Sequence, residues 1–146
     1  MSVVHNAVLA ALDALPKDVS PRQRLEAAVK AHLLSSLEHS DYTSACIRAF
    51  AFLPEELRKT CRVERRRYED IWRGIVNDAA KAGAIPGDVS LDVARLMLLG
   101  AVNWAGEWYR PNRVPIEDIA ASFAKLAFGE APRKKASSRR RVTASK

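Results

Sequence analysis

Histidine and cysteine are the side chains of this sequence best suited to bind a metal or attack a substrate, but their spacing favours neither role. His32 and His39 are seven residues apart, which is two helical turns and not the one-turn separation of a helical metal pair. Cys46 and Cys61 lack the CxxC spacing of a zinc or redox site. No P-loop, GxGxxG or Gly-x-Ser-x-Gly motif is present. We therefore expect no metal, no cofactor and no catalysis.

Aromatic residues gather in one short stretch of the chain. Trp104, Trp108 and Tyr109 lie within six positions, at the end of an aliphatic run that begins near residue 91. Residues four apart share one face of a helix, so the two tryptophans are expected to lie together there. So much aromatic surface is usually packed against a partner or a ligand. The stretch predicts binding rather than catalysis.

Composition and charge indicate one soluble domain followed by a basic tail. The 146 residues are 48% hydrophobic, enough for one core. Seven of the 24 Lys and Arg residues lie in 131–146, so the other 17 balance the 17 Asp and Glu residues. We expect a domain over 1–129 without a net basic field for DNA, and a disordered tail over 130–146. The tail either contacts DNA non-specifically or only aids solubility.

The sequence carries no sign of export or of a membrane span. Its start lacks the basic and apolar regions of a signal peptide. The longest apolar stretch, residues 91–109, contains Asp92, Arg95 and Glu107, which a bilayer core disfavours. We therefore predict a cytoplasmic protein.

Apolar residues recur at helical spacing along the chain and predict an all-α fold of six helices. Ser20 and Gln23 form a capping box, Ser90 is a second N-cap, and Gly83 and Gly129 supply helix stops. No segment alternates as a half-buried strand does, so no sheet is expected. The expected helices span residues 2–14, 21–39, 41–53, 54–82, 90–109 and 115–128.

The last two expected helices are too apolar to be covered by one chain of this length. The helix over 90–109 is apolar on nearly all sides, whereas a surface helix has a polar back. Pairing with the same helices of a second subunit gives a four-helix interface with two-fold symmetry. The alternative is a central core helix in a monomer. The residues expected at the interface are Leu96, Leu99, Gly100, Glu107, Ile119, Phe123 and Leu126.

Three segments carry a resemblance to a known family. They are Ala-Gly-Ala-Ile-Pro at 82–86, Leu-Gly-Ala-Val-Asn-Trp-Ala-Gly-Glu-Trp-Tyr-Arg-Pro at 99–111, and Pro-Ile-Glu-Asp-Ile-Ala at 115–120. With the order of the helices, they resemble the C-terminal regulatory domain of TetR/AcrR-type transcriptional regulators over about residues 3–128. The resemblance implies a six-helix bundle that forms a homodimer through its last two helices. Residues 103–111 resemble most the branch whose ligands are often acyl-CoA thioesters or other lipid-like metabolites.

The resemblance also implies a ligand pocket between the helices that span 21–39, 42–52, 54–82 and 90–109. Such pockets are apolar with a few polar groups, which here are His32, Arg65, Asn103 or Arg110. An arginine would suit an anionic headgroup. For any single residue the alternative is that it simply fills the core. The expected pocket residues are His32, Leu33, Leu37, Ile47, Phe50, Arg65, Tyr68, Ile71, Trp72, Ile75, Leu98, Asn103, Trp104 and Trp108.

For function, the resemblance implies a repressor that releases DNA when a small hydrophobic or acyl-CoA-like effector shifts the helix over 3–14. Family members carry a helix-turn-helix headpiece ahead of this domain, whereas this chain begins at Met1 within the connecting helix. These residues alone are therefore not expected to read DNA. The competing hypothesis is a headless helical dimer that acts as a protein-interaction or scaffold module without DNA binding.

Overall fold

The computed structural model describes residues 2–38 and 50–129, and all regular structure among them is helical. The all-α fold is therefore confirmed for this part of the chain. The helix expected over 41–53 lies mostly outside the described residues, and so does the tail over 130–146. The elements are α1 (Ser2–Asp13), α2 (Pro21–Glu38), the 3-10 turn η1 (Phe50–Phe52), α4 (Glu55–Lys81), α5 (Leu91–Asn103), α6 (Ala105–Trp108) and α7 (Ile116–Phe128).

Local signals in the sequence set several helix ends where they were predicted. Ser20 Oγ accepts from the Gln23 amide at 3.3 Å, and Gln23 Oε1 accepts from the Ser20 amide at 2.9 Å, so the capping box starts α2. Ser90 Oγ accepts from the amide of Val93 at the start of α5. Gly83 follows α4 with a φ of 72°, a conformation that costs glycine least.

The prediction of a single helix over 90–109 is wrong, because the helix is interrupted at Trp104. α5 ends at Asn103 and α6 begins at Ala105. The Glu107 amide donates to the Trp104 carbonyl, three residues back, so the helical turn tightens at this point. Trp104 and Trp108 therefore do not share one uninterrupted helical face. Tyr109 is extended, with φ −62° and ψ 137°, and ends α6.

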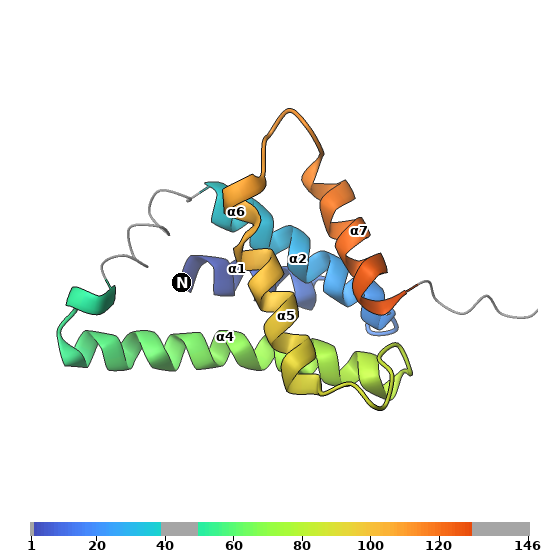
Figure 1. The fold of residues 1–146 in the computed structure, drawn as a ribbon, viewed down its shortest axis with the longest axis horizontal. Helices are drawn as coiled ribbons and strands as arrows, with labels where there is room; N and C mark the ends of the chain where they lie inside the picture. The colour runs from blue at the N-terminus through green and yellow to red at the C-terminus, as the bar shows by residue number, and fades with distance from the viewer. Residues whose placement is uncertain (1, 39–49, 130–146) are drawn as a thin grey trace, which may run out of the picture.

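The helices form two packed groups that meet along one seam (Figure 1). α2 packs between α1 and α7, and α5 crosses and packs on α4. Contacts between α2 and α4 are fewer, and we call this junction the α2–α4 seam. Each large side chain buried in such a core contributes about 1.5–3 kcal/mol. The largest fully buried side chains of the described core are Val8, Leu25, Val29, Leu33, Trp72, Ile75 and Val76.

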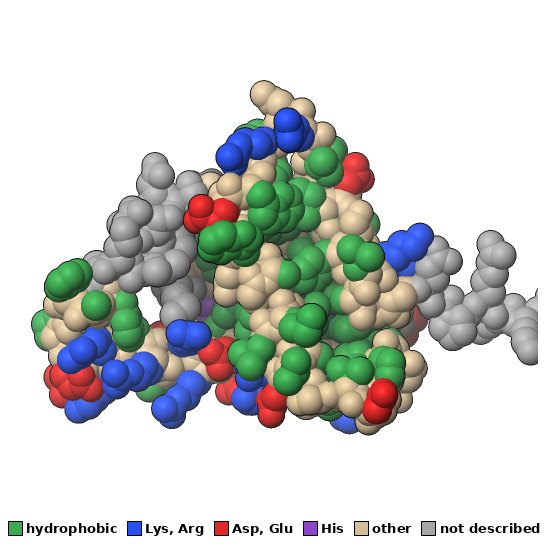
Figure 2. All heavy atoms as spheres, viewed as in Figure 1, with side chains coloured by type: hydrophobic (Ala, Val, Ile, Leu, Met, Phe, Trp, Pro, Cys, Tyr) green, Lys and Arg blue, Asp and Glu red, His purple; other side chains and the backbone are tan. Residues whose placement is uncertain are grey.

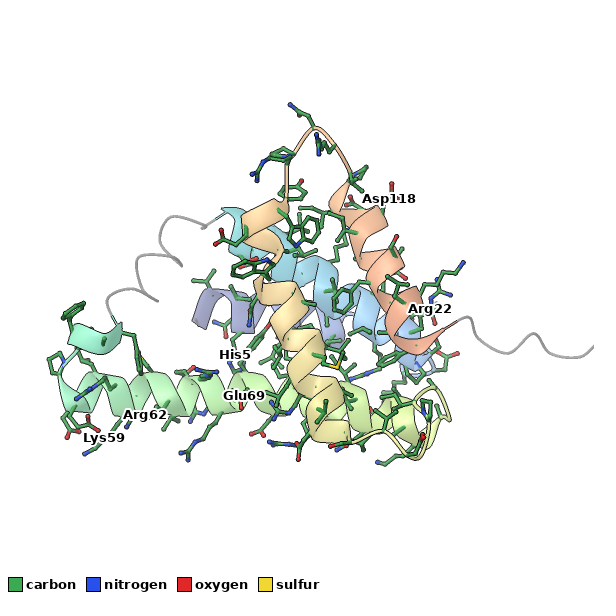
Figure 3. The ribbon with its side chains drawn as sticks, in the orientation of Figure 1. His5, Arg22, Lys59, Arg62, Glu69 and Asp118 are labelled. Carbon is green, nitrogen blue, oxygen red and sulfur yellow. The ribbon has the colours of Figure 1, made fainter. Side chains whose placement is uncertain are left out.

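Only the C-terminal part of α4 belongs to this core. Its buried residues all lie between Tyr68 and Ala79, whereas the part with Lys59 and Arg62 projects past the other described helices (Figures 1 and 3). This projecting part holds the charged run over 62–67, which interrupts the apolar stripe of the sequence. Its arginines form surface ion pairs, such as Arg62 with Glu55 at 3.2 Å. Among the described residues, no helix is both long enough and apolar enough to cross a membrane.

Candidate functional site

Four side chains with rings meet where α1, α2 and α4 come together, and we call them the ring cluster. They are His5 from α1, His32 from α2, and Tyr68 and Trp72 from α4. Nδ1 of His32 lies 2.5 Å from the hydroxyl oxygen of Tyr68. The Tyr68 ring centroid is 6.0 Å from that of His5, 5.9 Å from that of His32 and 6.2 Å from that of Trp72. Tyr68 is thus the centre of the cluster.

Helical periodicity places the cluster at one end of an apolar stripe. Tyr68 and Trp72 are four residues apart on α4 and continue the buried face formed by Ile75 and Ala79. On α2, His32 follows the buried Ala28 and Val29 along the same side. The ring cluster is therefore the polar part of a seam that is otherwise apolar.

Burial keeps His32 and Tyr68 uncharged at neutral pH. His32 is 5% exposed, Tyr68 is 8% exposed and Trp72 is fully buried. Burial lowers the pKa of His32 from 6.5 to about 4. Burial also raises the pKa of Tyr68 well above its usual value. That indole nitrogen has no hydrogen-bond partner among the described residues.

An ion-pair network lies beside the cluster, where α5 crosses α4 (Figure 3). Glu69 accepts from Arg65 Nε at 3.0 Å, and Arg95 Nη1 lies 3.5 Å from its other oxygen. Arg95 is 8% exposed and also lies 3.7 Å from Asp92. A buried guanidinium needs such partners, because its charge has lost most of its hydration. Arg65, expected in the pocket, is instead held at the surface by Glu69.

The described residues bring together only part of the expected pocket. Arg65, Asn103, Trp104 and Trp108 are exposed, and Phe50 is 37% exposed. Ile47 lies outside the described residues. The expected pocket residues that are buried in the described core, or pack against it, are His32, Leu33, Leu37, Tyr68, Ile71, Trp72, Ile75 and Leu98.

The two tryptophans of the aromatic stretch lie on a surface rather than in the seam. Trp104 is 65% exposed and Trp108 is 50% exposed. Leu96 and Met97 of α5 and Leu126 of α7 are exposed as well, at 57%, 69% and 88%. We call these five residues the apolar face. Figure 2 shows hydrophobic side chains gathered over α5, α6 and α7 on the visible side of the molecule.

The residues expected at a subunit interface mostly retain surface that a partner could cover. Ile119 and Phe123 are half-buried, whereas Leu99 is 8% exposed and belongs to the core of its own chain. Leu99 thus has little area to offer a second subunit. The exposed members of the expected interface are Leu96, Gly100, Glu107 and Leu126.

A surface hollow of about 330 Å³ lies between α6 and the start of α7. One of its residues is Arg110, expected as a polar group of the pocket. Nη1 of Arg110 donates to the backbone carbonyls of Tyr109 at 2.7 Å and Glu107 at 3.4 Å, so this side chain holds the turn after α6. The hollow is lined by Trp108, Tyr109, Arg110, Arg113, Val114 and Ile119.

Metal chemistry has no visible support in the part of the chain that the structure describes. No group of three His, Cys, Asp or Glu side chains there is placed to hold a metal ion. Cys61 is a free, half-buried thiol, and Cys46 lies outside the described residues.

Comparison with known proteins identifies this arrangement of helices. Residues 18–130 match the sequence profile of the tetracyclin repressor-like C-terminal domain. The chain belongs to this TetR-type family. The resemblance inferred from the segments at 82–86, 99–111 and 115–120 is thereby confirmed. No curated protein matches the sequence.

Solved structures of TetR-family regulators share the fold. PfmR of Thermus thermophilus is 21% identical with a TM-score of 0.71, over 87% of this chain and 70% of that one. A TetR/AcrR-family regulator of Thermobifida fusca is 27% identical with a TM-score of 0.65, over 90% and 70% of the two chains. SCO3833 of Streptomyces coelicolor is 24% identical with a TM-score of 0.59, over 88% and 69%.

Two residues at or beside the ring cluster were not among those expected from the sequence. His5 lies in the first expected helix, and Arg95 was considered only as a charge that a bilayer core disfavours. The signal for Arg95 was present, because a lone arginine among aliphatic residues with Asp92 three positions before it is typical of a buried, paired charge. His5 had no comparable signal, because its contact with Tyr68 depends on how α1 packs.

Proposed function

We propose that this TetR-type domain is the effector-binding and dimerising part of a cytoplasmic transcriptional regulator. The effector is a small hydrophobic molecule, of which acyl-CoA thioesters are one candidate class, and its binding releases DNA held by the complete protein. The observation that carries the proposal is the ring cluster. It places buried, uncharged polar groups in an apolar seam, and it links that seam to α1 through the rings of Tyr68 and His5.

Effector binding in the α2–α4 seam would act on α1 through Tyr68. The seam has fewer contacts than the packing of α2 on α1 and α7, so opening it disrupts less of the described core than separating α2 from either helix would. A ligand shifts an equilibrium only by its difference in affinity for the two arrangements. An effector that displaces the Tyr68 ring favours an arrangement in which the His5 contact, and with it the position of α1, has changed. In TetR-type regulators, by the family resemblance, this helix leads to the DNA-binding headpiece.

The apolar face supports a homodimer through α5 and α7. Large apolar side chains that are exposed together on α5, α6 and α7 are typical of a protein interface. A two-fold axis would place the same face of both subunits in contact.

The dimer is tested by sedimentation of the wild type and of Leu126→Glu combined with Leu96→Glu. The wild type should sediment as a dimer at micromolar concentration, and the double variant as a folded monomer, because two buried carboxylates per subunit would lack partners. Val3→Glu is the matched control, since Val3 is 50% exposed on α1, a helix that contributes no residue to the apolar face. A monomeric wild type would refute the proposed dimer.

The effector is tested by thermal unfolding and tryptophan fluorescence with dodecanoyl-CoA, dodecanoate and 2-tridecanone. A ligand that binds only the folded state raises the melting temperature as its concentration exceeds the dissociation constant. At least one of these compounds should do so and should change the fluorescence. A dimer that responds to none of them would instead support a helical interaction or scaffold module, which would use the same apolar face.

A further inference from the structure

We propose that the ring cluster recognises an uncharged hydrogen-bond acceptor of the effector, such as the carbonyl oxygen of a ketone or an ester, and disfavours a carboxylate or phosphate at that point. This inference rests on the proposed effector site and specifies the chemistry of its polar end. The groups that carry it are the imidazole of His32, the hydroxyl of Tyr68 and the indole N–H of Trp72.

The number of hydrogen-bond donors in the cluster does not depend on the tautomer of His32. Neutral histidine and tyrosine together have two polar hydrogens, and their mutual hydrogen bond uses one of them. If Tyr68 donates to Nδ1, the Nε2–H of His32 remains. If Nδ1 donates instead, the hydroxyl hydrogen of Tyr68 remains. One donor of the pair is free in either case.

Trp72 supplies a second donor next to the first. Its indole nitrogen is buried without a hydrogen-bond partner among the described residues. Burying an unpaired donor destabilises the protein, and a ligand oxygen that accepts from this N–H would remove that cost. The rings of His32 and Trp72 lie edge to face, with centroids 6.3 Å apart and an angle of 81° between them. A carbonyl oxygen accepts two hydrogen bonds, so it suits a pair of donors carried by adjoining rings.

Neither His32 nor the two guanidiniums beside the cluster offer an anion an unpaired positive charge. His32 is neutral at neutral pH, because burial lowers its pKa to about 4. The neighbouring guanidiniums of Arg65 and Arg95 are both paired with Glu69. A carboxylate or phosphate moved into the seam would therefore lose its hydration without gaining a positive charge. Buried Leu33 and Ile75 of the same seam suit an alkyl chain.

The test compares three probes of similar chain length with the full chain at pH 7.5. They are 2-tridecanone, the isosteric alkene 2-methyl-1-tridecene, and dodecanoate. Affinities are measured by tryptophan fluorescence for the wild type and for the double variant His32→Leu/Tyr68→Phe. The double variant replaces both hydrogen-bond partners with apolar groups of similar size, a change that proteins often tolerate. The ratio of ketone to alkene affinity cancels the contribution of the alkyl chain.

We expect the wild type to bind the ketone at least tenfold more tightly than dodecanoate. The ratio of ketone to alkene affinity should fall at least fivefold in the double variant. In spectra of protein with ¹⁵N-labelled tryptophan, the ketone but not the alkene should move the indole proton signal of Trp72 downfield. This signal is distinguished from those of Trp104 and Trp108 by its absence from the spectrum of Trp72→Phe.

Two results would overturn the inference while the effector site stands. They are dodecanoate binding as tightly as the ketone, and an unchanged ratio of ketone to alkene affinity in the double variant. Binding of none of the three probes to the wild type would instead refute the proposed effector site itself, and the selectivity with it.

Discussion

The buried neutral imidazole of His32 makes a specific prediction about pH and stability. The pKa of this side chain falls from 6.5 in the unfolded chain to about 4 in the folded one, so the unfolded state binds more protons between these values. The contribution of neutral His32 to the free energy of unfolding is therefore fully present above pH 6.5 and is lost as the pH falls toward 4. At about 1.4 kcal/mol for each pH unit, the loss by pH 4.5 amounts to about 2.5 kcal/mol of unfolding free energy.

The assay is urea denaturation at pH 7.5, 6.5, 5.5 and 4.5, at one protein concentration because a dimer would make stability concentration-dependent. Carboxylates also titrate near pH 4.5, so the measurement is a difference between two variants. Tyr68→Phe keeps His32 buried, whereas His32→Leu/Tyr68→Phe removes it and leaves the remaining groups alike. The first should lose about 2.5 kcal/mol more than the second between pH 7.5 and 4.5. Parallel pH profiles would refute the reasoning.

Two further predictions concern the ion-pair network and the end of α4. Glu69→Gln removes the anion nearest the buried Arg95 and should lower the unfolding free energy, measured in urea, by about 2 kcal/mol. Glu64→Gln, which breaks a surface ion pair with Arg67, should change it little. Equal effects of the two variants would contradict the role of Glu69 as the partner of a buried charge. Gly83→Ala forces a side chain into a φ of 72° and should lower the unfolding free energy by about 1 kcal/mol. Gly74→Ala lies inside α4 with no atom near the added carbon, and it should raise the unfolding free energy by about 0.5–1 kcal/mol in the same measurement. Gains from both alanines would show that the turn after α4 does not need glycine.

The predictable part of the fold is the part that short-range chemistry decides. Ser20 and Gln23 start α2 through hydrogen bonds that involve only each other, so the sequence alone identified that boundary. Gly83 ends α4 because few other residues adopt its backbone conformation. The apolar stripe of Leu25, Val29 and Leu33 predicted which side of α2 is buried. Each of these inferences needed no knowledge of how the helices pack.

The unpredicted part depends on contacts between distant segments. Tyr68 and His32 are 36 residues apart, and their hydrogen bond follows from how α4 lies against α2. Trp104 is neither glycine nor proline, so nothing in the local sequence indicated an interruption there. The pocket set therefore mixed residues of the seam with residues of the surface, because an α5 that is apolar nearly all round does not indicate which side faces α4.

The two sides of α5 join the candidate effector site to the proposed dimer. Arg95 points to Glu69 of α4, one residue from Tyr68, whereas Leu96, next in sequence, is 57% exposed on the apolar face. Adjacent residues of a helix are about 100° apart around its axis, so one rigid helix presents both surfaces. If an effector moves α4 in the α2–α4 seam, the Glu69–Arg95 pair carries α5 with it. Because the proposed two-fold interface contains α5 from both subunits, the same movement would change the geometry of the proposed dimer. Glu69→Gln should then weaken the response of dimer geometry to a bound effector more than it weakens effector binding.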